Sequence, residues 1–242
     1  MLYFFLHNEI GFMGPVGMYY AEKAIPIPLF ILLAFVFIFI PYLLGSFNTA
    51  VFISKRMYHD DVRNYGSGNA GFTNIMRIYG TKAAVITFVG DLLKTAVAIM
   101  VGWCTLGYFT AYIAGLACFI GHIAPVFYQF KGGKGVVCTA TIMFMLDWRI
   151  FLIELILFIG ILVLTKYMSL ASVLAAMTYP IFLNRMNHTG LFLIELIAII
   201  IAAVIVFKHK DNLIRIYNGK ESKFKFRRTA KEVPAEKEET NE

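Results

Sequence analysis

The chain has 242 residues, of which 59% are hydrophobic and only 15% are charged, and its mean hydropathy is +0.71. Soluble domains are about 45–50% apolar and about 25% charged. The composition therefore excludes disorder for most of the chain, argues against a soluble monomer and favours a polytopic helical membrane protein. In such a protein the net charge of +7 indicates a cationic cytoplasmic face rather than a nucleic acid partner.

The apolar residues gather in long continuous runs. Residues 1–28 are mildly apolar and carry several Gly and Pro residues, which predicts an extension at the outer membrane interface, with a short amphipathic helix as the alternative. Seven apolar stretches follow and predict an all-α bundle of seven crossings: 29–54, 83–103, 106–127, 136–148, 150–165, 169–184 and 190–207. Among the stretches shorter than the ~20 residues that span a bilayer upright are 136–148 and 169–184.

Basic residues give the expected orientation of the bundle. With the amino terminus outside and seven crossings, 19 of the 22 Lys and Arg residues fall on the cytoplasmic side. Only Lys23, Arg149 and Arg185 fall outside. Such an excess is typical of cytoplasmic segments, whereas six crossings would split the basic set.

The segment after the last apolar stretch has two parts. Residues 208–228 are basic with spaced apolar residues, which predicts a helix on anionic headgroups, and residues 229–242 are polar and acidic. The chain is therefore expected to divide into an extension (1–28), a seven-helix membrane domain (29–212) and a cytoplasmic tail (213–242).

The first polar segment, residues 64–80, contains GSGNAG, which matches G-x-G-x-x-G. No strand precedes it and no βαβ unit surrounds it, so the context does not support dinucleotide binding. Glycines would still let backbone N–H groups approach an anion at the start of the next helix. At about 3.6 residues per turn, Asn69, Thr73 and Arg77 are expected to share a helix face. A tight interhelical turn is the alternative interpretation.

The second polar segment, residues 121–135, ends in KGGKG, so that glycines surround Lys134. The spacing is not that of a Walker A motif, but a flexible cationic loop suits an anion. A plain positive-inside loop is the alternative. His122, at a helix end, either takes part in this anion site or only forms a hydrogen bond to a backbone carbonyl.

Two further polar stretches lie on the same expected side. Residues 165–172 place Ser169 and Ser172 at i, i+3 near a helix start, where serine also serves as a cap. His209 and Asn212 follow the last apolar stretch.

Charged residues inside the apolar stretches allow two interpretations. Asp91 and Lys94 stand at i, i+3, and they mark either a function or a structural ion pair near the membrane edge. Glu154 and Glu195 lie toward the outer side and are expected to be interfacial.

The sequence lacks the motifs of several kinds of metal site and catalytic site. The chain contains no C-x-x-C, H-E-x-x-H, G-x-S-x-G or His-x4-Asp pattern, which argues against zinc sites, acyl-serine hydrolases and the His-x4-Asp acyltransferases. The three cysteines, far apart and in or beside apolar runs, are expected to be packing residues.

Six segments, in this order, resemble one family. They are GSFNTAVFISK, RNYGSGNAGFTNIMRIYG, GDLLK, GHIAPVFYQFKGGKGV, TKYMSLAS and KHKDNLIRIYNGKESKF. Together they are similar to the bacterial acyl-phosphate:glycerol-3-phosphate acyltransferases, the PlsY family. The resemblance runs from about Pro41 to Phe224 and leaves out the first 28 residues and the acidic tail.

The resemblance implies a seven-helix enzyme of the plasma membrane whose active site faces the cytoplasm. It implies transfer of a fatty acyl group from acyl phosphate to the 1-hydroxyl of sn-glycerol 3-phosphate, the first acylation step of phospholipid biosynthesis. The products are lysophosphatidic acid and phosphate. It implies no metal and no organic cofactor, with the two substrates and the lipid bilayer as partners. It also suggests association with the enzyme that supplies acyl phosphate.

The resemblance assigns catalytic roles to four residues: Ser67, Arg77, Lys134 and Ser172. It assigns substrate binding to nine: Asn69, Asn74, His122, Gly132, Gly133, Gly135, Ser169, His209 and Asn212. We expect Arg77 and Lys134 to hold phosphate groups, because both are cations beside glycine-rich backbone.

Two other classes compete with this interpretation. An anion or phosphate transporter or channel would also use cationic loops, although transporters often show repeats or broken helices at mid-membrane. A membrane scaffold that docks through its tail would leave the polar motifs unexplained.

Overall fold

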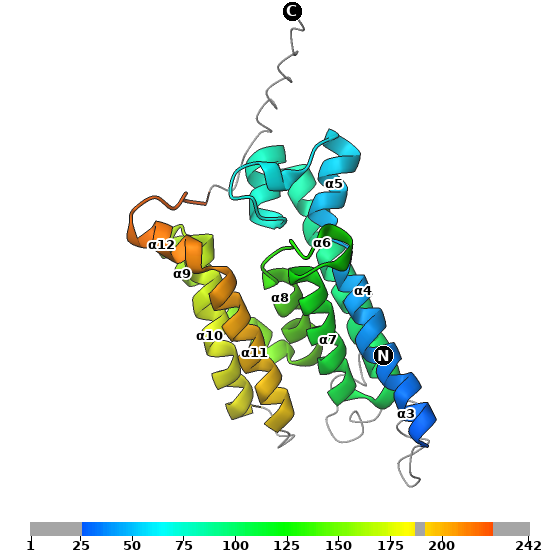
Figure 1. The fold of residues 1–242 in the computed structure, drawn as a ribbon. Helices are drawn as coiled ribbons and strands as arrows, with labels where there is room; N and C mark the ends of the chain where they lie inside the picture. Colours follow the sequence, from blue (N-terminus) through cyan, green and yellow to red (C-terminus); the bar gives the residue numbers. More distant parts are fainter. Residues whose placement is uncertain (1–25, 187–191, 225–242) are drawn as a thin grey trace, which may run out of the picture.

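The computed structural model describes residues 26–186 and 192–224, and every regular element in these ranges is helical (Figure 1). The acidic tail and nearly all of the expected 1–28 extension lie outside the described residues. The elements are α3 (Ile27–Ala34), a π-helical turn (Phe35–Phe39), α4 (Ile40–Ser46), α5 (Thr49–Tyr58), a 3₁₀ turn (Val62–Asn64), α6 (Phe72–Leu106), α7 (Tyr108–Ile123), a second 3₁₀ turn (Val126–Tyr128), α8 (Val136–Leu146), α9 (Trp148–Thr165), α10 (Met168–Met186), α11 (Phe192–Lys208) and α12 (Lys210–Tyr217).

Several of these helices have the length and apolarity to cross a membrane. Four segments qualify by themselves: Ile27–Tyr58, Phe72–Leu106, Tyr108–Tyr128 and Trp148–Thr165. The pair α11 and α12, bent by 51°, makes a fifth if it is one span. The short stretch expected at 136–148 is the 11-residue α8, about 16 Å long and thus about half of the hydrocarbon core. The expected all-helical membrane fold is confirmed.

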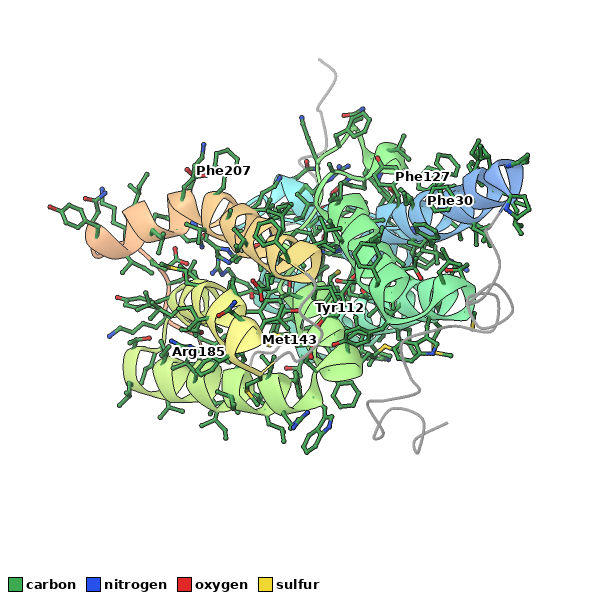
Figure 2. The ribbon with its side chains drawn as sticks, turned by 90° about the horizontal axis from the view of Figure 1, so that it is seen from below. Phe30, Tyr112, Phe127, Met143, Arg185 and Phe207 are labelled. Atoms are coloured by element: carbon green, nitrogen blue, oxygen red, sulfur yellow. The ribbon has the colours of Figure 1, made fainter. Side chains whose placement is uncertain are left out.

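The helices pack in two groups, which are joined by α8 and by the contact of α11 with α7. Helices α4, α6 and α7 contact one another, as do α9 with α10 and α10 with α11, and α8 contacts α6, α7 and α9 (Figure 1). Tyr112 and Met143 belong to the buried cluster between these helices, whereas Phe30, Phe127 and Phe207 are exposed at the periphery (Figure 2). Large apolar side chains on the outside are what a lipid-facing surface requires.

The first apolar stretch is interrupted rather than continuous. Its helix ends at Ser46, Phe47 is extended (ψ 103°), and Asn48 begins α5 by accepting a hydrogen bond from Val51 N at 3.0 Å. Helix ends leave carbonyls without intrahelical partners. Lys94 Nζ donates to two such carbonyls, those of Gly45 (3.2 Å) and Phe47 (2.8 Å).

Helix α6 is also broken, at Gly80, which has φ 83° and ψ −174°. This left-handed φ favours glycine because no Cβ clashes. The break separates the first turns, which carry Asn74 and Arg77, from the long apolar part. The expected shared helix face of Asn69, Thr73 and Arg77 is wrong, because α6 begins only at Phe72 and Asn69 lies in the preceding loop.

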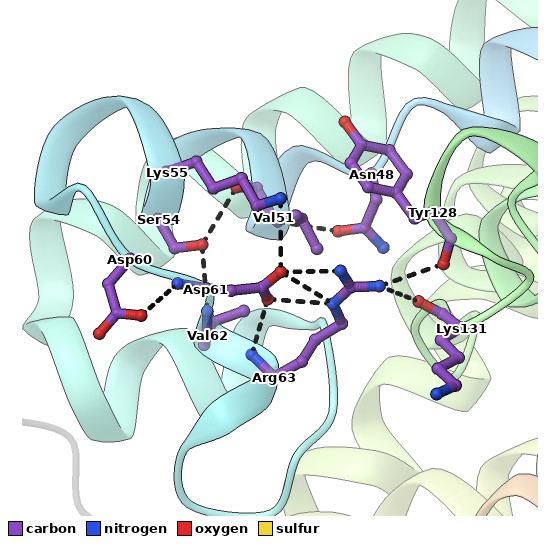
Figure 3. Close-up of polar contacts among 10 residues, drawn as sticks. All are labelled: Asn48, Val51, Ser54, Lys55, Asp60, Asp61, Val62, Arg63, Tyr128 and Lys131. Atoms are coloured by element: carbon purple, nitrogen blue, oxygen red, sulfur yellow. Dashed lines mark hydrogen bonds and ion pairs between the residues drawn. The ribbon is translucent and has the colours of Figure 1, made fainter.

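Arg63 joins the two loops that carry the glycine motifs (Figure 3). Its Nη2 lies 2.7 Å from Asp61 Oδ2, and its Nη1 donates to the carbonyls of Tyr128 (3.1 Å) and Lys131 (3.4 Å). Burial raises the pKa of Asp61, but the hydrogen bonds and charge of Arg63 outweigh it, so the pKa stays below its usual value. The carboxylate therefore stays charged at neutral pH and holds the Arg63 guanidinium, whose Nη1 reaches the second loop.

Candidate active site

A single cavity of about 360 Å³ brings most of the predicted residues together. Eleven of the thirteen line it: Ser67, Asn69, Asn74, Arg77, His122, Lys134, Gly135, Ser169, Ser172, His209 and Asn212. They come from the two glycine loops, the start of α6, the end of α7, α10, and α12 with the residue that precedes it. The rest of the lining is largely apolar and includes Met143, Phe151, Leu155, Phe158 and Ile205. The cavity thus combines polar and cationic groups with a wall suited to a hydrocarbon chain.

Gly132 and Gly133 are not among the lining residues, and they pack the second loop against the end of α7. Gly133 N donates to the carbonyl of His122 at 3.0 Å. A Cβ on Gly132 would overlap that carbonyl and lie 2.6 Å from Pro125 Cδ, and a Cβ on Gly133 would overlap the His122 ring. The two glycines therefore allow the close approach that places Lys134 at the cavity.

The first glycine loop is held by Asn74. Its Oδ1 accepts a hydrogen bond from Ser67 N (3.1 Å), and its Nδ2 donates to the carbonyls of Val62 (3.1 Å) and Tyr65 (3.0 Å). The side-chain amide of Asn74 thus holds the loop in place through three hydrogen bonds to its backbone. Asn74 was predicted to bind substrate, and in this structure its amide groups organise the loop that presents Ser67 and Asn69.

The two predicted phosphate-binding cations contact residues of the carboxyl-terminal segment. Arg77 Nη2 donates to Ser222 Oγ at 2.5 Å, and Lys134 Nζ contacts Asn212 Oδ1. Asn212 Nδ2 in turn donates to Glu221 Oε1 at 2.7 Å. The chain after α12 therefore folds back over the cavity.

Glu221 is a cavity residue that sequence reasoning missed. Its carboxylate accepts hydrogen bonds from Asn212, from Ser169 (3.0 Å) and from Arg215 Nε (2.8 Å). Burial raises the pKa of Glu221, but these three donors and the Arg215 charge lower it by more. The only signal for it in the sequence was its place in the segment GKESKF.

Two lining groups are oriented by bonds to their own helices. His209 Nδ1 lies 2.8 Å from the carbonyl of Ile205, and since a carbonyl only accepts, the ring nitrogen must donate. A neutral His209 then presents Nε2 as an acceptor. Ser172 Oγ donates to Met168 O at 2.8 Å, which leaves its lone pairs to accept.

A buried cluster of charged groups lies beside the cavity. Lys94 Nζ is 2.8 Å from Asp91 Oδ1 and 3.0 Å from His122 Nδ1, and Asp91 and His122 both line the cavity. Lys94 Nζ also donates to the carbonyls of Gly45 and Phe47 at the end of α4, so Asp91 and Lys94 form a buried ion pair that contacts both the helix end and the cavity residue His122. Within residues 26–186 and 192–224, no three His, Cys, Asp or Glu side chains gather as metal ligands.

Glu154 corrects a sequence expectation. It was expected at the outer interface, but it is 2% exposed and lines the cavity. Thr178 Oγ1, on the neighbouring α10, lies 3.0 Å from Glu154 Oε2. Packing of α9 on α10 decides this burial, which the position of Glu154 along the chain does not reveal.

A sequence model described as glycerol-3-phosphate acyltransferase matches residues 35–219. The chain belongs to this family. Relatives called glycerol-3-phosphate acyltransferase include one from Finegoldia magna, 40% identical over 75% of this chain and 91% of its own length. Another, from Thermoanaerobacter sp. strain X514, is 40% identical over 76% of this chain and 92% of its own length.

Solved structures support the same membership. One is the glycerol 3-phosphate form of PlsY (YgiH), an integral membrane glycerol 3-phosphate acyltransferase, with TM-score 0.74 and 34% identity over 80% of this chain and 96% of that one. The lysophosphatidic acid form has TM-score 0.71 and 31% identity over 79% and 95%. This chain is accordingly a membrane acyltransferase acting on glycerol 3-phosphate.

The acyltransferase should lose affinity for glycerol 3-phosphate at alkaline pH. Burial, opposed only partly by the Glu221 charge, lowers the pKa of Lys134 to about 8. A lysine binds phosphate as the ammonium, which is present below this pKa and lost above it. We expect kcat/KM for glycerol 3-phosphate to fall about tenfold per pH unit above about pH 8. Initial rates between about pH 6 and about pH 10 test this. In Lys134→Arg the fall should disappear, and an unchanged fall would assign it to another group.

Gly132→Ala should weaken substrate binding in this acyltransferase. The added Cβ would push the loop away from the His122 carbonyl and displace Lys134 from the cavity. We expect mainly a raised KM for glycerol 3-phosphate, the sign of lost ground-state binding. Gly160→Ala is the matched control, since its Cβ would meet nothing within 4 Å. Loss of folded protein with Gly132→Ala would instead show that the glycine serves packing alone.

Proposed function

We propose that the acyl donor is acyl phosphate and that the acceptor is the 1-hydroxyl of glycerol 3-phosphate. The observation that carries the proposal is one cavity in which Arg77 and Lys134 stand among polar groups while most of the remaining lining is apolar. Both substrates carry phosphate and one carries a long apolar chain, so each finds complementary groups there.

The reaction needs little beyond positioning. The hydroxyl oxygen bonds to the acyl carbonyl carbon, the bond from that carbon to the phosphate oxygen breaks, and the hydroxyl proton passes to the departing phosphate. Because phosphate is a good leaving group, fixed cations and donors suffice to stabilise the developing charge. Ser172 and the neutral His209 offer acceptors that would orient the glycerol hydroxyl.

The donor is tested with purified protein in lipid nanodiscs. Labelled glycerol 3-phosphate is incubated with acyl phosphate or with acyl-CoA, and lysophosphatidic acid and free phosphate are measured. We expect equal amounts of both products from acyl phosphate and no product from acyl-CoA. Direct use of acyl-CoA would refute the proposed donor while leaving the family unaffected. The transporter alternative has no specific observation in its favour.

We also propose seven crossings of the plasma membrane with the amino terminus outside and the cavity open to the cytoplasm. Support comes from the charge distribution together with helices over each apolar stretch. In a cysteine-free background, single cysteines at the exposed positions Lys131 and Lys220 should be labelled only from the cytoplasmic side, and Arg149→Cys only from outside. Labelling of the Lys131 position from outside would show that the cavity does not open to the cytoplasm. Association with the enzyme that supplies acyl phosphate stays a prediction.

A further inference from the structure

The ring of His122 stands between a lysine and a glycine. It belongs to the last turn of α7, is 4% exposed and lines the cavity. Its Nδ1 is 3.0 Å from Lys94 Nζ. Its Nε2, at the opposite corner of the ring, lies against Gly133, whose added Cβ would overlap this atom. The two nitrogens therefore face different surroundings.

Lys94 must be the charged ammonium at this position. Its Nζ has three oxygen acceptors within 3.2 Å, Asp91 Oδ1 (2.8 Å), Phe47 O (2.8 Å) and Gly45 O (3.2 Å), and His122 Nδ1 lies 3.0 Å away. An ammonium offers three hydrogens and no lone pair, which suits a shell of acceptors. A neutral amine would leave the buried Asp91 carboxylate without its cation.

The ammonium decides which ring nitrogen carries the proton. Because Lys94 only donates, a hydrogen bond between its Nζ and His122 Nδ1 requires Nδ1 to accept, and a neutral ring then holds its proton on Nε2. A proton on Nδ1 would point at the ammonium. The Asp91 Oδ1 atom lies 3.6 Å from Nδ1, beyond the usual hydrogen-bond distance.

We propose that Lys94 is a positioning residue that locks His122 as an Nε2–H donor to an anionic substrate oxygen in the cavity, and thereby excludes His122 as a general base. The proposal deepens the proposed function and names the role of one residue of that site. His209 has the opposite arrangement, because its Nδ1 donates to Ile205 O. The cavity thus holds one fixed imidazole donor and one fixed imidazole acceptor.

The tautomer is measured directly, without any activity assay. Protein labelled with ¹⁵N-histidine is studied by solid-state NMR in bilayers at neutral pH, and the two rings are assigned from signals lost in His122→Gln and His209→Gln. We expect His122 to be protonated at Nε2 and His209 at Nδ1. An Nδ1-protonated or doubly protonated His122 would overturn the proposal, whatever the acyl donor proves to be.

Kinetics distinguish a donor from a base. Glutamine carries an N–H donor but cannot take up a proton, so His122→Gln should lose about tenfold in kcat/KM, whereas His122→Ala should lose about 10²-fold. If His122 were a base, both variants would fall equally, and a limb of the pH profile would vanish in both.

The role of Lys94 is tested with its counter-ion removed at the same time. Lys94→Met alone would strand the buried Asp91 charge, so the variant is Lys94→Met with Asp91→Asn. We expect a mixture of His122 tautomers and a raised KM for glycerol 3-phosphate. In the His122→Gln background the same pair of changes should cost much less. A single Nε2–H tautomer of His122 in the double variant would show that Lys94 does not set the tautomer. If the double variant does not fold, the wild-type spectrum still tests whether His122 carries its proton on Nε2.

Discussion

Arg77→Lys should remove most of the acyltransferase activity while the protein still folds and inserts. Arg77 lies in the first turns of α6 ahead of Gly80, lines the cavity and donates to Ser222 Oγ at 2.5 Å. A guanidinium grips phosphate with two parallel N–H groups, whereas an ammonium is a point charge on a different stem. We expect kcat/KM to fall by about 10²–10³-fold, as when one preorganised charge-stabilising donor is removed.

Arg56→Lys is the matched control for this substitution. Arg56 is exposed in the last turn of α5 and is not among the residues that line the cavity. Arg63 would be a poor control because it joins the two loops. Purified protein in nanodiscs gives the rates, and the yield of monodisperse protein reports folding. Near-wild-type turnover of both variants would show that Arg77 serves only to orient the chain in the membrane.

Lys134→Gln should have a comparable effect, seen first in the affinity for glycerol 3-phosphate. Lys134 is the cation of the second glycine loop, and its Nζ contacts Asn212 Oδ1. Glutamine can replace the hydrogen bond but not the charge, so the phosphate loses its electrostatic partner in a partly buried site. We expect a fall of about 10²-fold or more in kcat/KM. The decline of kcat/KM above about pH 8 should be absent in this variant.

The same loop supplies the control for Lys134. Lys131 is exposed, and Lys131→Gln removes the same charge from the same loop without touching the cavity. It should keep nearly full activity. Equal losses in the two variants would mean that the loop acts through its overall charge, and the assignment of Lys134 as a phosphate ligand would then be wrong.

Much of the site could be predicted because its residues stand in short local motifs. The glycine-rich segments, the serine pair in α10 and the polar start of α12 are each recognisable within a few residues. Eleven of the thirteen predicted residues reach the cavity. The two that do not, Gly132 and Gly133, were predicted to bind substrate, and in the structure an added Cβ on either would overlap atoms of His122 at the end of α7.

Other features of the site could not be predicted from the sequence. Glu221 stands 52 residues from Ser169, and Ser222 stands 145 from Arg77, so no local pattern relates them. The helical face expected for Asn69 failed because a glycine-rich turn delays the start of α6. Glu154 was misplaced because burial inside a bundle depends on which helix lies alongside.

The sequence by itself determined the helical class and the positions of the apolar helices, because hydrophobic length is a property of consecutive residues. Its motifs also determined the family. Only the tertiary structure decided which polar groups meet. Lys94 reaches His122 across 28 residues, and Lys134 reaches Asn212 across 78. Buried polar atoms must find partners wherever packing brings them, so the interhelical geometry gives His122 its tautomer and Glu154 its burial.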